Sequence, residues 1–233
     1  MSQEAIRGID LASVDRVLRT TRTVRQRLDL ERPVPPEIIE QCIDIAYQAP
    51  TGANSQTWRF VVVTDADKRA KLGELYRKGS EVYLAGKTGL ARTNVSVAQG
   101  YAAEDLRTQQ MPAVVKSAVW LIENIHRVPV HVIACIEGRF VEEDLFTQAA
   151  MYGSVLQAAW SFQLALRARG LGSAWTTFNL LFEKETAAIV GIPDTYTQTV
   201  FLPVAWLTGG DVHPAKRLPS KSLTYWNDWG KTR

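Results

Sequence analysis

Two short polar stretches carry the side chains best suited to bind a flat, charged ligand. The first, residues 20–27, reads TTRTVRQR and places Arg22 and Arg25 three residues apart, on either side of Thr23. A guanidinium offers planar, charged donors that match a phosphate group or an electron-rich carbonyl edge. A solvated basic turn would have the same composition, so this stretch predicts a binding site only together with other elements.

The second stretch, residues 49–63, reads APTGANSQTWRFVVV. Pro50 disfavours helix at the residue before it, and the hydroxyl and amide side chains that follow are typical of a turn. The unbroken apolar run from Phe60 to Val63 indicates a strand buried on both faces. A polar loop between a helix and a buried strand is a rigid place from which to offer hydrogen bonds. The alternative is a connecting turn that binds nothing.

The elements that must position these stretches follow from the spacing of apolar residues. Ile6, Leu11, Val14 and Leu18 lie on one helical face, so the chain is expected to open with an amphipathic helix. Periods of 3.6 residues predict further helices, and apolar runs predict strands. The predicted helices cover residues 36–46, 66–78, 112–125, 144–169 and 183–190, and the predicted strands cover 60–63, 129–136 and 197–207. One α+β domain over residues 1–233, with a mixed sheet around a long helix, is the simplest arrangement of these elements.

Residues 144–169 are apolar on nearly all sides, which predicts a buried central helix. At 1.5 Å per residue it would be roughly 40 Å long, so part of its apolar surface is expected to meet another subunit. Residues 79–110 have weak periodicity and are interpreted as a lid or substrate-facing excursion. The tail, residues 209–233, carries large aromatic side chains in a polar setting and is expected to pack across a partner subunit.

Composition excludes several classes of function. The chain has 233 residues, 46% of them hydrophobic and 22% charged, with a net charge of +3 and no basic run with interleaved aromatics, so nucleic acid is not the expected partner. Two cysteines without a CxxC spacing indicate neither a disulfide framework nor a metal site. No apolar segment is long enough to span a membrane and no signal peptide is evident, so a cytoplasmic location is expected.

The familiar catalytic motifs are absent from the sequence. It contains no GxGxxG after a predicted strand, no phosphate-binding Walker loop, no HExxH and no GxSxG. The three histidines have no recognisable nucleophile beside them, and no carboxylates form an evident acid–base pair. If the protein is an enzyme, a bound cofactor is therefore expected to carry the chemistry.

Taken together, three stretches resemble the FMN-dependent nitroreductase family over nearly the full chain. Residues 21–25 are similar to the family's N-terminal Arg-Ser-x-Arg element, and residues 49–60 to its Ala-Pro-Ser-x-x-Asn-x-Gln-Pro-Trp-x-Phe signature. Residues 170–178, followed by Lys216-Arg217-Leu218-Pro219, match its C-terminal half in order and spacing. The resemblance implies a homodimer with noncovalently bound FMN, reduced by NADH or NADPH, that passes electrons to a nitroaromatic or quinone-like acceptor in a ping-pong cycle.

The resemblance also implies roles for individual residues. Arg22 and Arg217, supported by Thr23 and Lys216, are expected to bind the FMN phosphate. Arg25 is expected at the N1/O2 edge of the isoalloxazine ring, where a guanidinium stabilises the negative charge of the reduced flavin. No side chain is expected to be catalytic, since flavin N5 carries the chemistry. The remaining expected flavin contacts are the ring-lining Pro50, Thr51, Asn54 and Gln56, part of which reach the partner's cofactor, and a backbone N–H near N5 from the segment Thr176, Thr177 and Phe178.

Departures from the family pattern leave the second substrate open. Thr21 stands where many members carry a basic residue, and Thr57 replaces the proline before the tryptophan. Phe178 stands where some members have glycine, which narrows the space near the flavin. Reductive dehalogenation, flavin reduction, a flavin-binding module without turnover and a plain helical interaction protein remain as alternatives.

Overall fold

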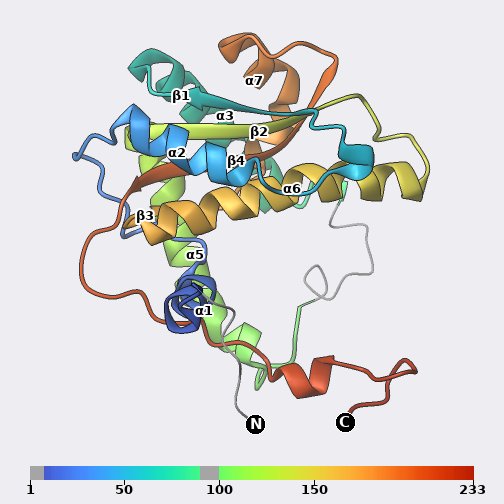
Figure 1. The fold of residues 1–233 in the computed structure, drawn as a ribbon. Coiled ribbons are helices and arrows are strands. Elements are labelled where there is room, and N and C mark those ends of the chain that lie inside the picture. Colours follow the sequence, from blue (N-terminus) through green and yellow to red (C-terminus); the bar gives the residue numbers. More distant parts are fainter. Residues whose placement is uncertain (1–7, 90–99) are drawn as a thin grey trace.

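The structure is a computed structural model that describes residues 8–89 and 100–233 (Figure 1). A four-stranded sheet crosses its centre, and helices cover both faces. The strands are β1 (Trp58–Val63), β2 (Val130–Glu137), β3 (Leu171–Ser173) and β4 (Tyr196–Trp206). The helices are α1 (Leu11–Thr20), α2 (Pro36–Ala46), α3 (Ala66–Leu84), α5 (Leu106–Asn124), α6 (Leu145–Ala168) and α7 (Glu183–Val190). Short 3-10 turns are η1 (Gly52–Asn54), η3 (Ile125–Arg127), η4 (Phe178–Phe182) and η5 (Ser220–Leu223).

The strands are arranged in the order β1-β2-β4-β3, and every described pairing is antiparallel. The α+β class is confirmed, but the expected mixed pairing is wrong for these strands. The reason lies in the connections. Among the described residues, α3 and α5 lie between β1 and β2, and β2 starts at the end of the sheet where β1 stops, because Val63 pairs with His131. A single crossover helix would have returned the chain for a parallel pairing.

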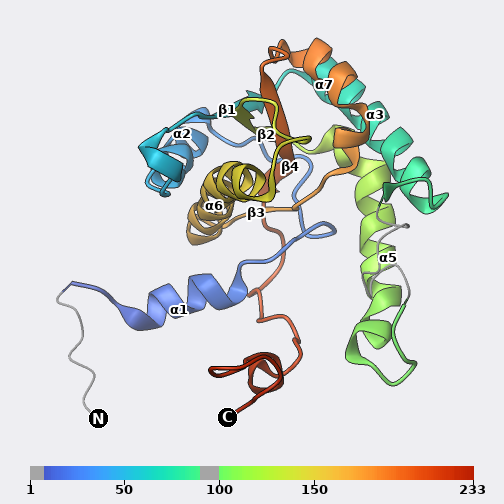
Figure 2. The ribbon, with the colours of Figure 1, turned by 90° about the vertical axis from the view of Figure 1, so that its right-hand side faces the viewer.

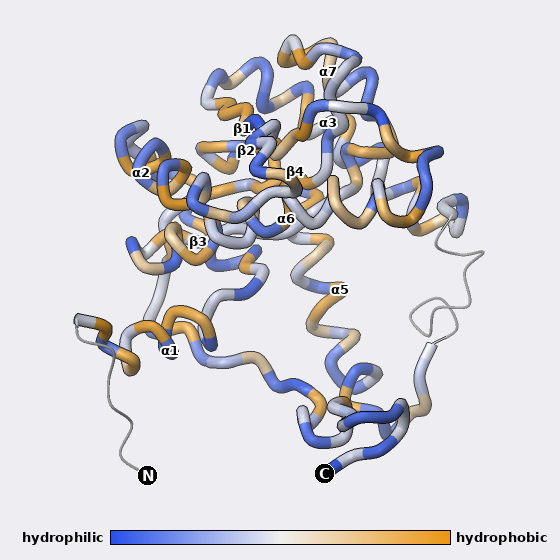
Figure 3. Tube along the Cα trace, turned by 45° about the vertical axis from the view of Figure 1, so that its right-hand side comes forward, coloured by the Kyte–Doolittle hydropathy of each residue, from blue (hydrophilic) through white to orange (hydrophobic). Residues whose placement is uncertain are grey.

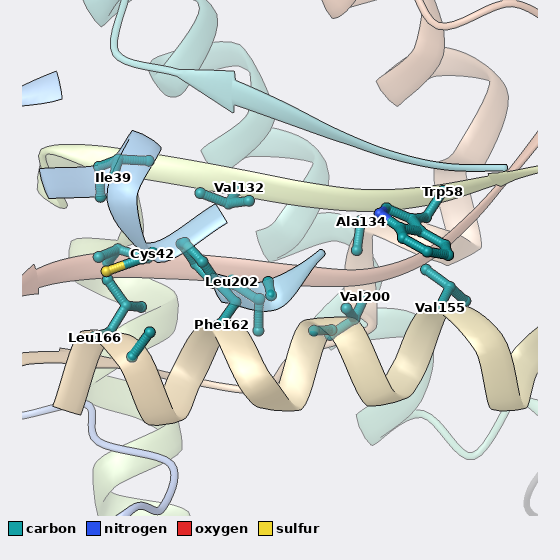
Figure 4. Packing of buried hydrophobic residues seen from close by; sticks show 14 of the residues in the cluster. Ile39, Cys42, Trp58, Val132, Ala134, Val155, Phe162, Leu166, Val200 and Leu202 are labelled. Carbon is teal, nitrogen blue, oxygen red and sulfur yellow. The ribbon is translucent and has the colours of Figure 1, made fainter. Parts of the chain in front are cut away.

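The two faces of the sheet bury two separate apolar cores. Alternation along β2 sends Val132 and Ala134 towards α2 and α6, and Ile133 and Cys135 towards α3 and α5. Figure 4 shows the first core, in which Phe162 of α6 reaches up between the helices and the sheet. Figure 2 shows the same division, with α2 and α6 on one side of the strands and α3, α5 and α7 on the other. Both faces are therefore covered, as the unbroken apolar strands predicted.

The long helix predicted from residues 144–169 is confirmed as α6. Asp144 caps its N-terminus, because the Asp144 carboxylate accepts a hydrogen bond from the Thr147 N–H at 2.8 Å. Its buried residues lie between Ser154 and Leu166, and its first turn is exposed. Leu145 and Phe146 are 82% and 83% exposed, respectively, and Trp160 is 39% exposed. In the single chain, α6 thus keeps apolar surface that the sheet does not cover.

Two predicted helices have different bounds from those expected. Helix α3 continues to Leu84, and α5 begins at Leu106 and runs through Pro112. Asp105 caps α5 through a 2.8 Å hydrogen bond from the Arg107 N–H, a stronger start signal than the proline that was taken as the boundary. Within the predicted excursion 79–110, residues 90–99 lie outside the described part of the chain. The same is true of Ile6 on the predicted first helix.

Three segments extend away from the sheet and the helices that cover it (Figures 1 and 2). They are α1, the N-terminal half of α5 and the tail after β4. Each carries exposed apolar side chains, and the hydropathy colouring of Figure 3 shows orange stretches along α1 and α5. These side chains include Leu11, Val14 and Leu18 of α1, Met111, Val114 and Val115 of α5, and Leu223, Trp226 and Trp229 of the tail.

Candidate functional site

Arg25 is positioned by two elements that are distant in the sequence. The Val24 N–H donates to the Ser173 carbonyl at 2.9 Å, and Thr23 Oγ1 accepts from the Trp175 N–H at 3.2 Å. These bonds lay residues 23–25 alongside the segment that follows β3. From α5, the Ser117 hydroxyl accepts a 3.1 Å hydrogen bond from Arg25 Nη1. The arginine is therefore held on one side and keeps other donors free.

The guanidinium of Arg25 is half-buried and has no carboxylate partner among the described residues. Burial lowers the pKa of Arg25 from its ordinary value. The phenol of Tyr76 lies close by, and burial raises the pKa of Tyr76 to about 12, so this neighbour is neutral. A partly desolvated cation without an anion is a typical partner for an electron-rich ligand group.

Tyr76 lies between Arg25 and the segment Thr176 to Phe178, and it contacts both. Thr176 pairs with Phe201 of β4, where its N–H and hydroxyl both donate to the Phe201 carbonyl at 3.1 and 2.7 Å. The next two residues leave the sheet, and within the described chain neither the Thr177 nor the Phe178 N–H donates to a backbone carbonyl outside η4. Thr177 is exposed and Phe178 half-buried, so these backbone donors are available to a ligand acceptor.

The three basic side chains expected at a phosphate lie in two places. Arg22 is exposed at a shallow groove that it lines with Arg167 and Ser173. Lys216 and Arg217 are exposed on the tail, where the Lys216 carbonyl accepts from Gln110 Nε2 of α5 at 3.2 Å. Gln110 precedes Ser117 by seven residues, so this point is about 10 Å along α5 from the Arg25 contact. None of the three cations forms an ion pair within the described residues.

The loop that carries Pro50, Thr51, Asn54 and Gln56 lies at a different part of α6 from Arg25. The Gly52 N–H donates to Ser154 Oγ at 3.0 Å. Nine residues later on the same helix, Gln163 Nε2 donates to Ser173 Oγ beside the Arg25 segment at 2.6 Å. The two anchor points are therefore about 13 Å apart along the helix.

Local hydrogen bonds and backbone geometry shape this loop. Thr51 Oγ1 accepts from the Gln56 N–H at 3.2 Å, and Asn54 Oδ1 accepts from Gln56 Nε2 at 3.0 Å. Ala53, Asn54 and Gln56 all have positive φ, between 51° and 54°. This region is unfavourable for non-glycine residues other than asparagine and aspartate, so the loop is held by its own contacts and by α6.

The largest openings do not decide the site, because the depression beside α7 lies apart from both Arg25 and the loop 50–56. A depression of about 590 Å³ lies beside α7, lined by Arg139, Glu183 and Gln198, and contains none of the predicted residues. The predicted residues lie instead on surfaces that one chain leaves open. Among the described residues, no cluster of His, Cys, Asp or Glu is arranged to hold a metal ion, and no helix is long and apolar enough to cross a bilayer. A cytoplasmic location stays a prediction.

Four neighbours of the predicted residues had no signal in the sequence. Tyr76 and Ser117 flank Arg25, Trp175 bonds to Thr23, and Ser154 holds the loop. Serine and tyrosine on helices resemble ordinary surface or core positions. A fifth residue, Gly79, lies inside α3 but one residue beyond the predicted end of this helix, so nothing in the sequence predicted that it would be packed.

The sequence model of the Nitroreductase family matches residues 18–206, which include Arg22, Arg25, the 50–56 loop and the 176–178 segment. The chain belongs to the Nitroreductase family. Lys216 and Arg217 lie beyond the matched residues.

Individual relatives match over shorter stretches. A protein of Stenotrophomonas maltophilia, provisionally named an NADH dehydrogenase/NAD(P)H nitroreductase, is 36% identical over 73 residues, which is 31% of this chain and 36% of the relative. Iodotyrosine deiodinase 1 of Rattus norvegicus is 39% identical over 57 residues, 24% of this chain and 20% of the relative. The matched part therefore spans about a third or less of these relatives.

Solved structures with the same fold match over nearly the whole chain. An iodotyrosine deiodinase bound to FMN and 3-iodo-L-tyrosine has a TM-score of 0.63 at 21% identity, covering 93% of this chain and 98% of that one. A nitroreductase-like protein from Bacillus cereus has a TM-score of 0.62 at 13% identity, covering 94% and 99%. At these identities the likeness is one of fold.

Proposed function

We propose that this nitroreductase-family chain is an FMN-dependent oxidoreductase that takes hydride from NADH or NADPH and reduces a nitroaromatic or quinone-like acceptor. One observation carries the proposal. The half-buried guanidinium of Arg25 has no carboxylate partner in the described chain, and its neighbour Tyr76 also packs against Phe178, whose ring centroid is 5.1 Å away. A cation close to a segment with available N–H donors suits a flat ligand that has several acceptors along one edge.

The residues present fit FMN. Its isoalloxazine ring has carbonyl and nitrogen acceptors along one edge, which suit Arg25 and a backbone N–H from the 176–178 segment. Its phosphate suits Arg22, Lys216 and Arg217, which form no ion pair within the described residues. When bound, FMN would supply the hydride-accepting and hydride-donating chemistry.

The chain's own residues orient the ligand and stabilise charge. Arg25 places a fixed positive charge where negative charge develops on reduction, in a partly desolvated setting that strengthens its effect. Ser117 holds that guanidinium from α5, and Thr23 holds the backbone of Trp175. No nucleophile or acid–base pair is required of the side chains.

A second copy of the chain is part of the proposal. In one chain the Thr51–Gln56 loop and the Arg25 group contact separate parts of α6, so one chain does not bring them to the same ligand. A homodimer related by a two-fold axis across α6 would place the loop of one copy against the Arg25 group of the other. The exposed apolar side chains of α1, α5, α6 and the tail (residues 209–233) supply the surface for such a contact.

Reductive dehalogenation is the second candidate function. It is supported by the relatives that carry the name iodotyrosine deiodinase, and by the likeness of fold to one of them. The sequence of the predicted lid, residues 79–110, shows no evident set of side chains for binding an amino-acid zwitterion, which is why this candidate ranks second.

The visible spectrum of the purified protein tests the proposal first. We expect flavin absorption, and anaerobic mixing with NADPH or NADH should bleach it near 450 nm within seconds, on the order of one turnover of a typical enzyme. Reoxidation by a nitroaromatic, a quinone and 3-iodotyrosine would then rank the acceptors. Colourless protein that refuses added FMN would overturn the proposal, and bound FMN that is never bleached would indicate a binding module.

A further inference from the structure

One face of α3 surrounds Phe178, the residue at the end of the 176–178 segment. Tyr76, Gly79 and Tyr83 are spaced by three and four residues, so they lie on the same helical face. The ring of Tyr76 is 5.1 Å from that of Phe178, and the ring of Tyr83 is 5.4 Å from it, centroid to centroid. We call this face, made of Tyr76, Gly79 and Tyr83, the α3 clamp.

Between the two tyrosines, Gly79 brings the helix backbone against the backbone of Phe178. A Cβ at position 79 would lie 2.2 Å from the Phe178 carbonyl oxygen and 2.8 Å from its carbonyl carbon, closer than real Cβ atoms come. Gly79 is in ordinary helical geometry, so the absence of a side chain, and not a special dihedral, is what the position requires. Glycine is among the weakest helix formers, so its place inside α3 has a packing reason.

We propose that the α3 clamp aims the amides of Thr177 and Phe178 at the flavin, and that Gly79 is the positioning residue on which this depends. The inference rests on the proposed function and deepens it. The Phe178 carbonyl and N–H share one Cα, so pushing the carbonyl away from α3 also turns the N–H. The rings of Tyr76 and Tyr83 hold the Phe178 side chain and limit that rotation.

A matched control lies on the same helix. Gly73 is also packed against another segment, and a Cβ there would lie 2.9 Å from the Cβ of His126 in η3. Both Gly79→Ala and Gly73→Ala therefore force a shift of a neighbour. Only the first of them moves the segment that contains Thr177 and Phe178.

The experiment compares the two variants with the parent protein, with and without FMN. We expect both to melt at a lower temperature. Only Gly79→Ala should move the amide NMR resonances of Thr177 and Phe178 in the flavin-free protein, weaken FMN binding about tenfold, as expected for the loss of one aligned hydrogen bond, and change the fine structure of the flavin spectrum. If Gly79→Ala does not fold, Tyr83→Ala opens the clamp without a clash and should weaken FMN binding in the same direction.

The outcomes separate this inference from the proposed function. Parent protein that does not bind FMN overturns both. Parent protein that binds and reduces FMN, with variants at positions 79 and 73 that resemble each other in FMN affinity and amide resonances, overturns the clamp alone. An unchanged FMN affinity in a folded Tyr83→Ala also overturns it.

Discussion

At the scale of single residues, Arg25 is the side chain whose surroundings say most about function. Its contacts are to Ser117 on α5 and to neutral Tyr76 on α3, and neither carries a negative charge. Arg139, although more exposed than Arg25, is paired with the Glu183 carboxylate at 2.7 Å. That the more buried Arg25 has no such partner among the described residues supports the proposed ligand contact.

Arg217 tests the predicted phosphate contact. It is exposed and forms no ion pair among the described residues, so Arg217→Ala should change the free energy of unfolding by less than about 0.5 kcal/mol. A hydrogen bond to a charged group contributes about 1.5–3 kcal/mol, so the Kd for FMN should rise about 10- to 100-fold. Fluorescence titration of FMN measures this. Lys221→Ala, in η5 on the same tail, is the control, and equal affinity in parent and Arg217→Ala would remove the phosphate assignment.

His131 gives the fold a pH dependence of predictable sign. Its Nε2–H donates to the Ile125 carbonyl at 2.8 Å, and burial lowers the pKa of His131 from 6.5 to about 3. Between these values the unfolded chain binds a proton that the folded chain does not, so stability falls as pH falls below 6.5. The loss between pH 7 and pH 5 should be about 2 kcal/mol.

Urea unfolding at these two pH values measures the loss. In His131→Gln, the part of this pH-dependent loss that comes from His131 should disappear, whatever the stability of the variant at pH 7. A variant with the same pH dependence as the parent protein would show that His131 is not the group responsible.

At the scale of elements, the loop 50–56 depends on α6 for its position. Its own hydrogen bonds close the turn, but three positive φ values at non-glycine residues make it unfavourable in isolation. Ser154 connects it to the helix, accepting from the Gly52 N–H at 3.0 Å while donating to the Ala150 carbonyl at 2.7 Å. The loop is therefore a fixed extension of α6.

Ser154→Ala tests this connection. The variant leaves the Gly52 N–H without its acceptor at a partly buried position, which should cost about 1–3 kcal/mol of stability. Hydrogen exchange at the Gly52 amide should become faster. Exchange at amides of β2 should change only as much as the loss of global stability requires. Ser222→Ala is the control, since that hydroxyl bonds only within its own exposed turn. Unchanged exchange at Gly52 would show that the loop holds itself.

At the scale of the whole molecule, the arrangement of exposed apolar residues is the main clue to assembly. Trp229 is 91% exposed, and Phe146 at the start of α6 is 83% exposed. Single exposed hydrophobic residues are common, but here many of them lie on the three extended segments and at the start of α6. Because a soluble monomer rarely keeps so many together, they point to a partner surface.

We expect the 26.0 kDa chain to sediment as a dimer at micromolar concentration. Replacing two apolar residues on the exposed face of α1, Val14→Asp and Leu18→Asp, should shift the equilibrium to monomer and release FMN, because a charge in the interface is left unpaired. Ser13→Asp together with Asp15→Asn, on the same helix, is the polar control. Sedimentation velocity distinguishes the species, and a monomer that binds FMN fully would contradict the shared site.

Much of the fold is readable from local patterns. The length and burial of α6, the β2 and β4 strands and the polar turn after Pro50 all follow from the spacing of apolar residues and from turn formers close together in the chain. Residues 23–25 and 170–178 were also singled out by the resemblance, and in the structure these two stretches lie side by side. The bounds of α5 were missed, since a capping aspartate at 105 outweighs a proline six positions into the helix.

The order of residue types along the chain was enough to predict guanidiniums, a small polar loop and apolar helices in the arrangement of one family. It could not predict that Ser117 holds Arg25, that Gly79 packs under Phe178, or that the loop and Ser173, beside Arg25, contact separate parts of α6. The physical reason is that composition and periodicity act over one or two turns of chain. Contacts between residues 25 and 117, or 79 and 178, exist only once two faces of a sheet have been covered by particular helices.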